Sequence, residues 1–539
     1  MTTGRSWRGR RVAAAVASGL LLAAAFPPLD LGPLALVALV PLLWAWRGAG
    51  PRAAALYGGA AGLAFFAALV EWTRYFGLVA VVPFVLFLSS WWLLAGAVVG
   101  WLGRRGVAAV PVVAAVWVLV EAGRGGVPFG GFPWGDVGYA FHDWGGARAL
   151  AGWGGVPLVS WVAVVVNGFV LDALLAWRGA RRAEAGAGSR LAPVRPLAGV
   201  VAVLVVAGMA AAARPTLTPT GRLRVALVQG NDRNRDLTPE EIRDRSLVRN
   251  HLRLAGGISA PVDLIVLPES SLDADPRQDP YLDVALSGLA GDHHADVLAG
   301  GNVAAPQGRL YNSAFHYTPG PADATEPSGT GRTPEIYRKR HLVPFGEYVP
   351  WRSELSFIDA LQGVPTDYEP GPGPTVFRIA GHRVGALICF ESAFAPLARQ
   401  YARRGADALV VLTNNRSYRR SANSAQHLAM GQFRAAETGR PLLQGAISGI
   451  SAVVDHTGRV RARTALFEPT VLVGEVTTYR GRTPYTVAGE WVVMASSVLL
   501  LAGVVAAGRR RRSTPGDGGC APDQGGGSRQ ASDGGADQP

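Results

Sequence analysis

Cysteine is almost missing from this chain of 539 residues, which has only Cys389 and Cys520. Cys389 lies in a region of short strands and helices, whereas Cys520 lies in a Gly-, Asp- and Gln-rich tail that has no means of burying a core. We therefore expect no structural disulfide. The sequence also lacks metal-ligand spacing, a phosphate-cradling glycine loop and any haem or flavin signature, so we expect neither a metal nor a cofactor.

Lysine is rarer still. Among 52 Lys and Arg residues, Lys339 is the only lysine. A lysine in a loop is ordinarily solvated, but arginine serves solvation and salt bridges equally well. A compact ammonium that can be desolvated and can reach a small oxyanion does work that arginine does poorly. The single lysine is therefore a candidate for a chemical role.

The net charge of +13 does not indicate a nucleic-acid partner. The basic clusters lie at the ends of apolar runs, where they act as a topology signal, and we expect no nucleic acid to bind. The clusters are Arg5, Arg8, Arg10 and Arg11; Arg104 and Arg105; Arg178, Arg181 and Arg182; and Arg509 to Arg512.

Apolar residues make up 49% of the chain and concentrate in residues 1–213 and again at 491–507. The first region predicts a transmembrane domain of about seven helices and the second a final transmembrane helix, because one crossing takes roughly 20 residues. The first segment also fits a cleavable signal peptide, although further apolar segments follow it at once. The eight segments lie at about 12–26, 33–46, 55–70, 79–101, 107–122, 153–177, 194–213 and 491–507.

The arginines also predict the orientation in the cell membrane. Alternating crossings from a cytoplasmic start leave only Arg74, Arg124 and Arg148 in the short outside loops, and put the arginine-rich loops inside. Both termini are then cytoplasmic. The region 222–480 becomes an extracytoplasmic domain, and 508–539 a disordered cytoplasmic tail.

One expected outside loop, residues 121–148, is unusually aromatic. It contains Phe132, Trp134, Tyr139 and Trp144. Such residues commonly form an interfacial belt that anchors a protein in the bilayer. The alternative is a lip that guides a lipid toward a site above it.

Residues 222–480 predict a mixed α/β sandwich with functional groups at strand ends. The run 427–440 has helical spacing and ends at Gly439 before Pro441, and 452–460 indicates two strands with a turn around His456 to Gly458. The predicted buried strands are 222–230, 263–270, 295–303, 383–392 and 406–415.

Three polar residues at strand ends or in loops can form a nucleophilic system. Cys389 ends the apolar run VGALI, and Glu269 follows the strand LIVLP, where it can act as a base. A buried cysteine is more often only a small hydrophobe. However, a thiol needs a base or a cation to attack at neutral pH, and acyl transfer needs a positive group for the oxyanion. Glu269 and Lys339 can supply both.

Together, LPES with Glu269, YRKRHLVPFGEYVP with Lys339 and ICFES with Cys389 resemble the three signatures of the nitrilase superfamily, in that order. The HLVPFGEYVP string and the membrane-embedded frame are similar to the apolipoprotein N-acyltransferase family over nearly the whole chain. The resemblance implies a multi-pass α-helical membrane domain and a nitrilase-like αββα sandwich domain.

The resemblance also implies a ping-pong reaction. Cys389 attacks an acyl ester of a membrane phospholipid, and the thioester then acylates the α-amine of a diacylglyceryl-cysteine lipoprotein. It assigns the base to Glu269 and oxyanion support to Lys339. Further implied residues are the supporting carboxylates Glu347 and Glu391 and the substrate-binding Asn312 and Phe390.

The chain departs from that family after the strand VVLTN. The family usually has Asn-Asp-x-Trp-Phe-Gly there, whereas this chain reads NNRSYRRSANSAQHL at 414–428. Arg416, Arg419 and Arg420 in this loop could pair with lipid phosphate or be simply solvated.

Two other functions fit parts of the pattern. A membrane-tethered amidase or nitrilase-type hydrolase would use water as the acceptor, and a lipid-binding protein could retain the scaffold without catalysis. The number of crossings argues against the hydrolase and the intact triad against the binding protein. We expect the chain to work as a monomer.

Overall fold

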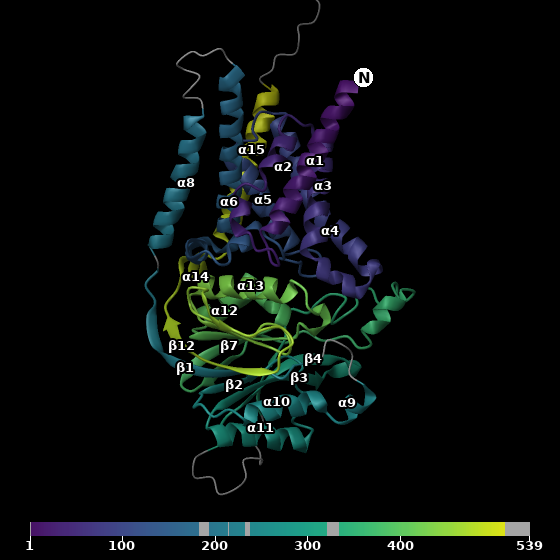
Figure 1. Cartoon of the computed structure of the whole chain (residues 1–539), viewed down its shortest axis with the longest axis vertical. Coiled ribbons are helices and arrows are strands. Elements are labelled where there is room, and N and C mark those ends of the chain that lie inside the picture. Colours follow the sequence, from purple (N-terminus) through teal and green to yellow (C-terminus); the bar gives the residue numbers. More distant parts are fainter. Residues whose placement is uncertain (1, 183–192, 214, 232–237, 321–333, 513–539) are drawn as a thin grey trace, which may run out of the picture.

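The computed structural model describes residues 2–182, 193–213, 215–231, 238–320 and 334–512. A helical part and a two-sheet part lie on opposite sides of the molecule (Figure 1). The helical part contains α1 (Thr2–Ala24), η1 (Gly32–Leu36), α2 (Val40–Trp46), α3 (Pro51–Leu69), η2 (Glu71–Phe76), α4 (Leu78–Gly103), α5 (Val110–Arg124), η3 (Val137–Phe141), α6 (Gly145–Arg182), α8 (Val194–Ala212) and α15 (Trp491–Arg512).

Among the described residues, five helices are long and apolar enough to cross a membrane, namely α3, α4, α6, α8 and α15. The segment expected at 33–46 is not one helix. It divides into η1 and the seven-residue α2, with a proline in the first turn of each. Because proline lacks an N–H and fits only the start of a helix, the two prolines break this segment into two short turns of helix.

The other expected segments also differ in length from the helices. The segment at 107–122 forms α5, which has 15 residues. The segment at 153–177 lies within α6, whose backbone leaves helical angles at Gly154 and Gly155. The last helix continues past 507 to Arg512, and the rest of the expected tail, with Cys520, lies outside the described residues.

The sandwich consists of two six-stranded sheets, ordered β12-β1-β2-β3-β4-β5 and β11-β10-β9-β8-β7-β6. Parallel pairs form the centre of each sheet and antiparallel pairs its edges. The strands are β1 (Thr218–Gln229), β2 (Leu264–Leu267), β3 (Asp296–Ala304), β4 (Leu310–Tyr317), β5 (Glu335–Arg338), β6 (Val376–Ile379), β7 (His382–Ile388), β8 (Ala408–Thr413), β9 (Leu442–Ala446), β10 (Ala452–Val454), β11 (Val460–Arg463) and β12 (Thr470–Arg480).

Helices cover both outer faces, which completes the expected αββα order. Helices α10 (Ser246–Gly256) and α11 (Pro280–His293) lie on the face away from the helical part, and α12 (Ala395–Arg403) and α13 (Asn423–Thr438) on the face toward it (Figure 1). Shorter helical elements are α9 (Pro239–Arg243), η4 (Pro306–Gly308), η5 (Asp359–Gly363), η6 (Cys389–Ala393), η7 (Arg416–Tyr418) and α14 (Pro484–Ala488).

The packing of the core on both faces of each sheet explains why these strands could be predicted from the sequence. Side chains that alternate along β1 pack on opposite faces: Val225 and Leu227 lie between the two sheets, whereas Ala226 and Val228 pack toward α10 and α11. Strands buried on both faces appear in the sequence as continuous apolar runs. Each of the five predicted strand segments contains a strand, and β10 and β11 form the predicted hairpin.

Candidate active site

Cys389 lies at a sharp turn between a strand and a helix. Strand β7 ends at Ile388, and η6 begins at the cysteine itself. The backbone of Cys389 has φ of 50°, in the left-handed region that residues with a side chain rarely adopt. The turn directs the chain out of the sheet at the thiol, and such strain is typical of functional positions.

Glu269 lies on the other sheet, two residues after β2, and is followed by Ser270 with φ of 59°. Its carboxylate accepts hydrogen bonds from the Asn312 side chain (2.7 Å) and from the backbone N–H of Asn414 (2.7 Å). A Cβ on Gly300 of β3 would lie 2.6 Å from the Glu269 Cα. Glycine at position 300 therefore allows the backbone of Glu269 to lie against β3.

Lys339 directly follows β5 and is 1% exposed. Its Nζ lies 2.8 Å from Glu347 Oε1 and 3.5 Å from Glu269 Oε1. Asn312 also donates to Glu347 (2.9 Å), so the amide joins the two carboxylates. The structure thus brings four of the residues predicted from the sequence into one buried cluster.

The charges in this cluster determine its protonation. Burial disfavours the ammonium of Lys339, but Glu347 and Glu269 outweigh this effect and hold its pKa well above the ordinary value. Burial, and next the charge of Glu269, raise the pKa of the Cys389 thiol to about 12, although Lys339, the Thr413 side chain and the Asn414 N–H act in the opposite direction. Cys389 therefore carries its proton at neutral pH, so that an attack by this sulfur would need a base to remove the proton.

Glu391 supports the turn through its hydrogen bonds to the backbone. Its carboxylate accepts from the Tyr337 hydroxyl (2.8 Å), from the backbone N–H of Ile388 (2.8 Å) and from that of Arg340 (2.8 Å). Burial raises its pKa. Glu391 thereby ties the loop after Lys339 to the end of the strand before Cys389.

Phe390 begins a row of aromatic rings that leads to the helical part. Its ring stacks on Phe132 with centroids 5.8 Å apart, and Phe132 stacks on Trp134 at 5.6 Å and meets Phe84 of α4 edge-on at 4.9 Å. Phe132 and Trp134 of the aromatic loop are thus directed toward the cysteine turn, whereas Trp144 is 41% exposed.

The loop that departs from the family pattern packs on the helical part. Tyr418 in η7 meets Trp72 edge-on at 4.8 Å and Phe76 at 5.8 Å, and the Arg419 guanidinium lies 5.0 Å from the Tyr75 ring. Tyr418 thus supplies an aromatic contact in a loop that lacks the family's tryptophan.

Thr413, Gln426 and His427 were not predicted from the sequence. Thr413 ends β8 and its side chain acts to lower the pKa of the Cys389 thiol, and His427 donates to the backbone carbonyl of Cys389 (3.0 Å). Helix α13 carries polar residues on every face although it is buried almost throughout. That polarity is a sign in the sequence that buried polar partners surround this helix.

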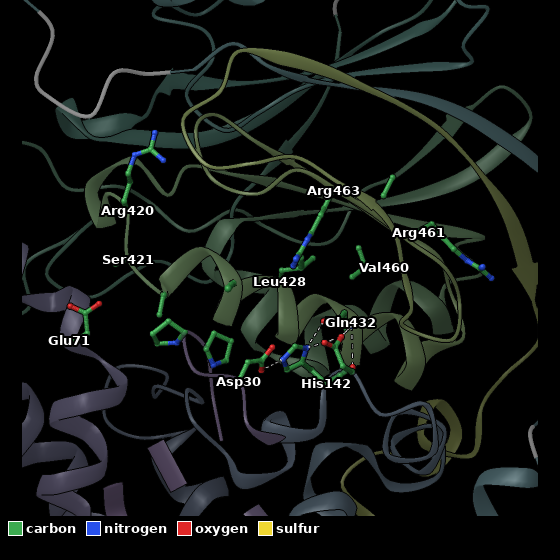
Figure 2. Close-up of a pocket in the computed structure, with 16 residues that line it drawn as sticks. Asp30, Glu71, His142, Arg420, Ser421, Leu428, Gln432, Val460, Arg461 and Arg463 are labelled. Atoms are coloured by element: carbon green, nitrogen blue, oxygen red, sulfur yellow. Dashed lines mark hydrogen bonds and ion pairs between the residues drawn. The ribbon is translucent and has the colours of Figure 1, made fainter. Parts of the chain in front are cut away.

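A cavity of about 760 Å³ lies away from this cluster, between α13, β11 and loops of the helical part. His142 is held there by Asp30 (2.8 Å) and Gln432 (2.9 Å), as Figure 2 shows. Asp30, His142 and Asp143 could hold a metal ion, with ligand atoms within 4.8 Å of one another. Burial alone would lower the pKa of His142, but hydrogen bonds to Asp143 and Asp30 raise it to about 9.

Comparison with known proteins matches both parts of the chain. The profile of the apolipoprotein N-acyltransferase N-terminal domain matches residues 18–169, and the carbon-nitrogen hydrolase profile matches 224–485. Among solved structures, Nit3 of Saccharomyces cerevisiae, from the nitrilase superfamily, covers 48% of this chain and 91% of its own at 18% identity and a TM-score of 0.34, which is too low to support an argument.

Relatives named apolipoprotein N-acyltransferase match over almost the full length. The protein of Geobacter metallireducens is 32% identical over 90% of this chain and 93% of its own. The protein of Azotobacter vinelandii is 33% identical over 91% of this chain and 94% of its own. The protein of Mycolicibacterium smegmatis is 33% identical over 90% of this chain and 83% of its own. With a matching helical part, a carbon-nitrogen hydrolase sandwich and relatives of this identity and coverage, the chain belongs to the apolipoprotein N-acyltransferase family and is an acyltransferase.

Proposed function

We propose that this enzyme transfers a fatty acyl group from a membrane phospholipid to the N-terminal amine of a diacylglyceryl-cysteine lipoprotein. The transfer passes through a thioester on Cys389. One observation carries the proposal: a buried ammonium, Lys339, lies between two carboxylates within the electrostatic reach of a thiol at a strained turn. These groups are the base, the cation and the nucleophile that acyl transfer requires.

In the first half-reaction Glu269 takes the proton from the Cys389 thiol while the sulfur attacks the ester carbonyl carbon of the phospholipid. The negative charge on the carbonyl oxygen is stabilised by Lys339. When the intermediate collapses, the bond between the carbonyl carbon and the glycerol oxygen breaks. The glycerol oxygen takes the proton from Glu269, which releases a lysophospholipid and leaves the acyl group on sulfur.

In the second half-reaction the amine of the lipoprotein attacks the thioester carbonyl carbon. Glu269 removes a proton from the amine, the carbon–sulfur bond breaks, and the proton returns to the sulfur. The products are an N-acylated lipoprotein and the free Cys389 thiol. Since the reaction conserves oxidation state and needs no activated cofactor, the side chains of this cluster suffice.

Four supporting residues complete the proposed site. Glu347 and Asn312 hold Lys339 and Glu269 in place through the hydrogen bonds given above. Glu391 fixes the backbone on both sides of the reacting groups. Phe390, with the aromatic row beside it, gives an acyl chain an apolar surface next to the thiol.

The two substrates explain the helical part. The acceptor is inferred from the relatives' name, and the donor from the aromatic row that joins the cysteine turn to α4.

We propose a transmembrane domain at 1–213, an extracytoplasmic catalytic domain at 222–480, a last crossing at 491–507 and a cytoplasmic tail at 508–539. Both termini are then cytoplasmic, and we propose that the enzyme acts as a monomer.

The orientation has a direct test that uses the two cysteines of the chain. In a Cys389→Ser variant, the tail residue Cys520 is the only thiol. A maleimide that cannot cross membranes should label Cys520 only after intact cells are permeabilised. Labelling in intact cells would contradict a cytoplasmic tail.

The reaction is tested with a radiolabelled phospholipid and purified enzyme. We expect an acyl label on the protein that hydroxylamine removes, that is absent from Cys389→Ser, and that passes to the amine of a diacylglyceryl lipopeptide. Release of free fatty acid instead of acylated peptide would favour the hydrolase. Binding of lipid without any covalent label would overturn catalysis through Cys389.

A further inference from the structure

Two neighbouring residues of α13, Gln426 and His427, are buried and have no part in the chemistry above. They are 3% and 1% exposed. Helix α13 lies between the sheet that carries Cys389 and the helical part of the molecule (Figure 1). The two side chains extend to these two sides, since His427 contacts the cysteine turn and Gln426 contacts the helical part.

His427 holds the carbonyl group of the nucleophile itself. Its Nε2 lies 3.0 Å from the Cys389 oxygen and 2.6 Å from Ser392 Oγ, which in turn donates to the same carbonyl at 3.1 Å. Because a carbonyl oxygen can only accept, Nε2 must carry the proton. Burial lowers the pKa of His427 to about 4, so the ring is neutral and its Nδ1 is an acceptor.

The other ring nitrogen points to the last residue of β8 and to the loop after it. Nδ1 lies 3.4 Å from Asn415 Nδ2 and 3.4 Å from Thr413 Oγ1. The ring therefore joins the carbonyl of Cys389 to the end of β8, the strand next to β7 in the same sheet.

These hydrogen bonds can hold the backbone of Cys389 in its left-handed conformation. A residue with a side chain adopts such a conformation only where the surrounding structure holds it, because the backbone would otherwise relax. The carbonyl of Cys389 is the group that rotates when the backbone relaxes. Ser392 and His427 are the two side chains that bind it.

Gln426 fixes the same helix to the helical part with four hydrogen bonds. Its Oε1 accepts from the indole N–H groups of Trp134 (2.7 Å) and Trp72 (3.1 Å), and its Nε2 donates to the carbonyls of Leu69 (3.0 Å) and Pro27 (3.1 Å). The Trp134 ring also lies 6.0 Å from the ring of His427. The amide uses two donor and two acceptor positions, so no other side chain of this size replaces it.

We propose that His427 is a positioning residue that holds Cys389 in its reactive geometry, and that Gln426 makes this geometry depend on contact with the helical part. The effect on acyl transfer rests on the function proposed above. The effect on the thiol does not, because the position of the sulfur can be probed without a lipid. The helical part is then a component of the active site and more than an anchor.

The experiment compares His427→Leu and His427→Gln with a matched control, His251→Gln. His251 of α10 is also 1% exposed, and burial also lowers its pKa to about 4. Its Nδ1 lies 2.8 Å from the Leu247 carbonyl of the same helix, so the ring has no contact with the cysteine turn through this atom. All variants are made in full-length protein with Cys520→Ser, so that Cys389 is the only thiol. Thermal unfolding in detergent gives the stability of each variant.

Two rates are measured for each variant. For His427→Leu we expect thioester formation to fall about 100-fold in kcat with KM for the phospholipid changed less than threefold, since the residue acts on the nucleophile and not on binding. We expect alkylation of Cys389 by iodoacetamide at pH 8 to become at least fivefold faster, because a relaxed thiol is less buried and its pKa is closer to the ordinary value. His427→Gln, whose amide can donate to the same carbonyl, should have a kcat at least tenfold higher than that of His427→Leu.

His251→Gln should lower the unfolding temperature but leave both rates within threefold of the wild-type values. If it changes both rates as His427→Leu does, loss of stability explains the result and the positioning role is wrong. If His427→Leu alkylates at the wild-type rate, the proposal is wrong even if no acyl transfer is ever observed. If alkylation changes but the wild-type protein forms no thioester, the proposed function fails while the positioning role stands.

The link to the helical part is tested with Gln426→Leu and Gln426→Glu. Gln426→Leu keeps the approximate volume and removes all four hydrogen bonds, whereas Gln426→Glu keeps an acceptor for the two tryptophans and loses the two donors. We expect faster alkylation of Cys389 and about a tenfold loss in kcat for Gln426→Leu, and a smaller change for Gln426→Glu. Wild-type alkylation in a folded Gln426→Leu protein would overturn the dependence on the helical part.

Discussion

Two clusters of buried charge differ in what their cation contacts. In the first, Lys339 lies between Glu269 and Glu347 and acts on the Cys389 thiol through space. In the second, Arg434 of α13 pairs with Glu437 (2.8 Å) and donates to Ala393 O and Tyr139 OH. Both cations are 1% exposed, so burial alone does not separate a reactive site from a structural one.

The difference lies in the geometry of the two cations. The guanidinium of Arg434 spreads its donors over three groups, one of them Tyr139 of the helical part, and so fixes the helix between the two parts of the molecule. The ammonium of Lys339 is a point charge that can turn toward a new oxygen atom. The chain uses arginine wherever a fixed fork or a solvated charge suffices, and its one lysine lies between the two carboxylates of the first cluster.

Exchanging the cation of the reactive cluster should have the largest effect. We expect Lys339→Arg to lower the rate of thioester formation by about 10³-fold, roughly 4 kcal/mol in the barrier, because the larger planar group cannot fit between two carboxylates and still reach the oxyanion. Membrane insertion and the unfolding temperature should change little. Retention of more than about a tenth of the rate, roughly 1.4 kcal/mol, would remove Lys339 from its proposed role.

The reciprocal exchange, Arg434→Lys, should act on stability. A lysine can keep the contact with Glu437 but not those with both Ala393 and Tyr139, which should cost about 2 kcal/mol of unfolding free energy. Thermal unfolding in detergent measures the loss, and the kcat of the folded protein should stay within about fivefold. A variant with normal stability and no activity would show that the two clusters do not differ as described.

The pH dependence of Cys389 alkylation should show whether the thiol of the first cluster keeps its proton. Since the pKa of Cys389 is raised to about 12, its thiolate fraction increases with pH over the whole accessible range. Alkylation by iodoacetamide in a Cys520→Ser background should therefore rise about tenfold per pH unit, equivalent to about 1.4 kcal/mol, between pH 7 and 10. A plateau below pH 9 would mean that the thiolate forms before substrate binds.

The smallest effect is expected at another buried pair of the helical part. Arg124 donates to Asp136 (2.5 Å) and to the carbonyl of Trp134 (2.6 Å). Asp136→Asn keeps an acceptor and should cost about 1 kcal/mol of stability with little change in kcat. A large loss of activity with normal stability would extend the reactive cluster into the aromatic loop.

The two-sheet part was the more predictable of the two parts. Strands buried on both faces form apolar runs that end in polar residues, and this pattern located Glu269 and Cys389 at the ends of β2 and β7. The missed strands, such as β5 and β6, are four residues each and lie toward sheet edges, where the apolar signal is short. The order of the sheets could not be predicted, because β12 returns to pair with β1 only through long-range contacts.

The helical part was less predictable because apolar composition does not distinguish a helix that faces lipid from a segment buried among other helices. Leu39 and Leu42 lie in a segment that is apolar because it packs inside the bundle, and that segment forms no long helix. In contrast, α8 has no buried residue and is equally apolar. Which of the apolar segments cross the membrane thus depends on packing as well as composition.

The sequence by itself determined which residues could carry charge, proton and acyl group, since strand periodicity, the single lysine and the three motifs are all local properties of the chain. Only the tertiary structure decided that Glu391 braces the backbone, that the thiol keeps its proton, and that His427 and Gln426 connect the cysteine turn to the helical part. Those properties arise from burial and from hydrogen bonds between residues far apart in the chain. No local pattern records them.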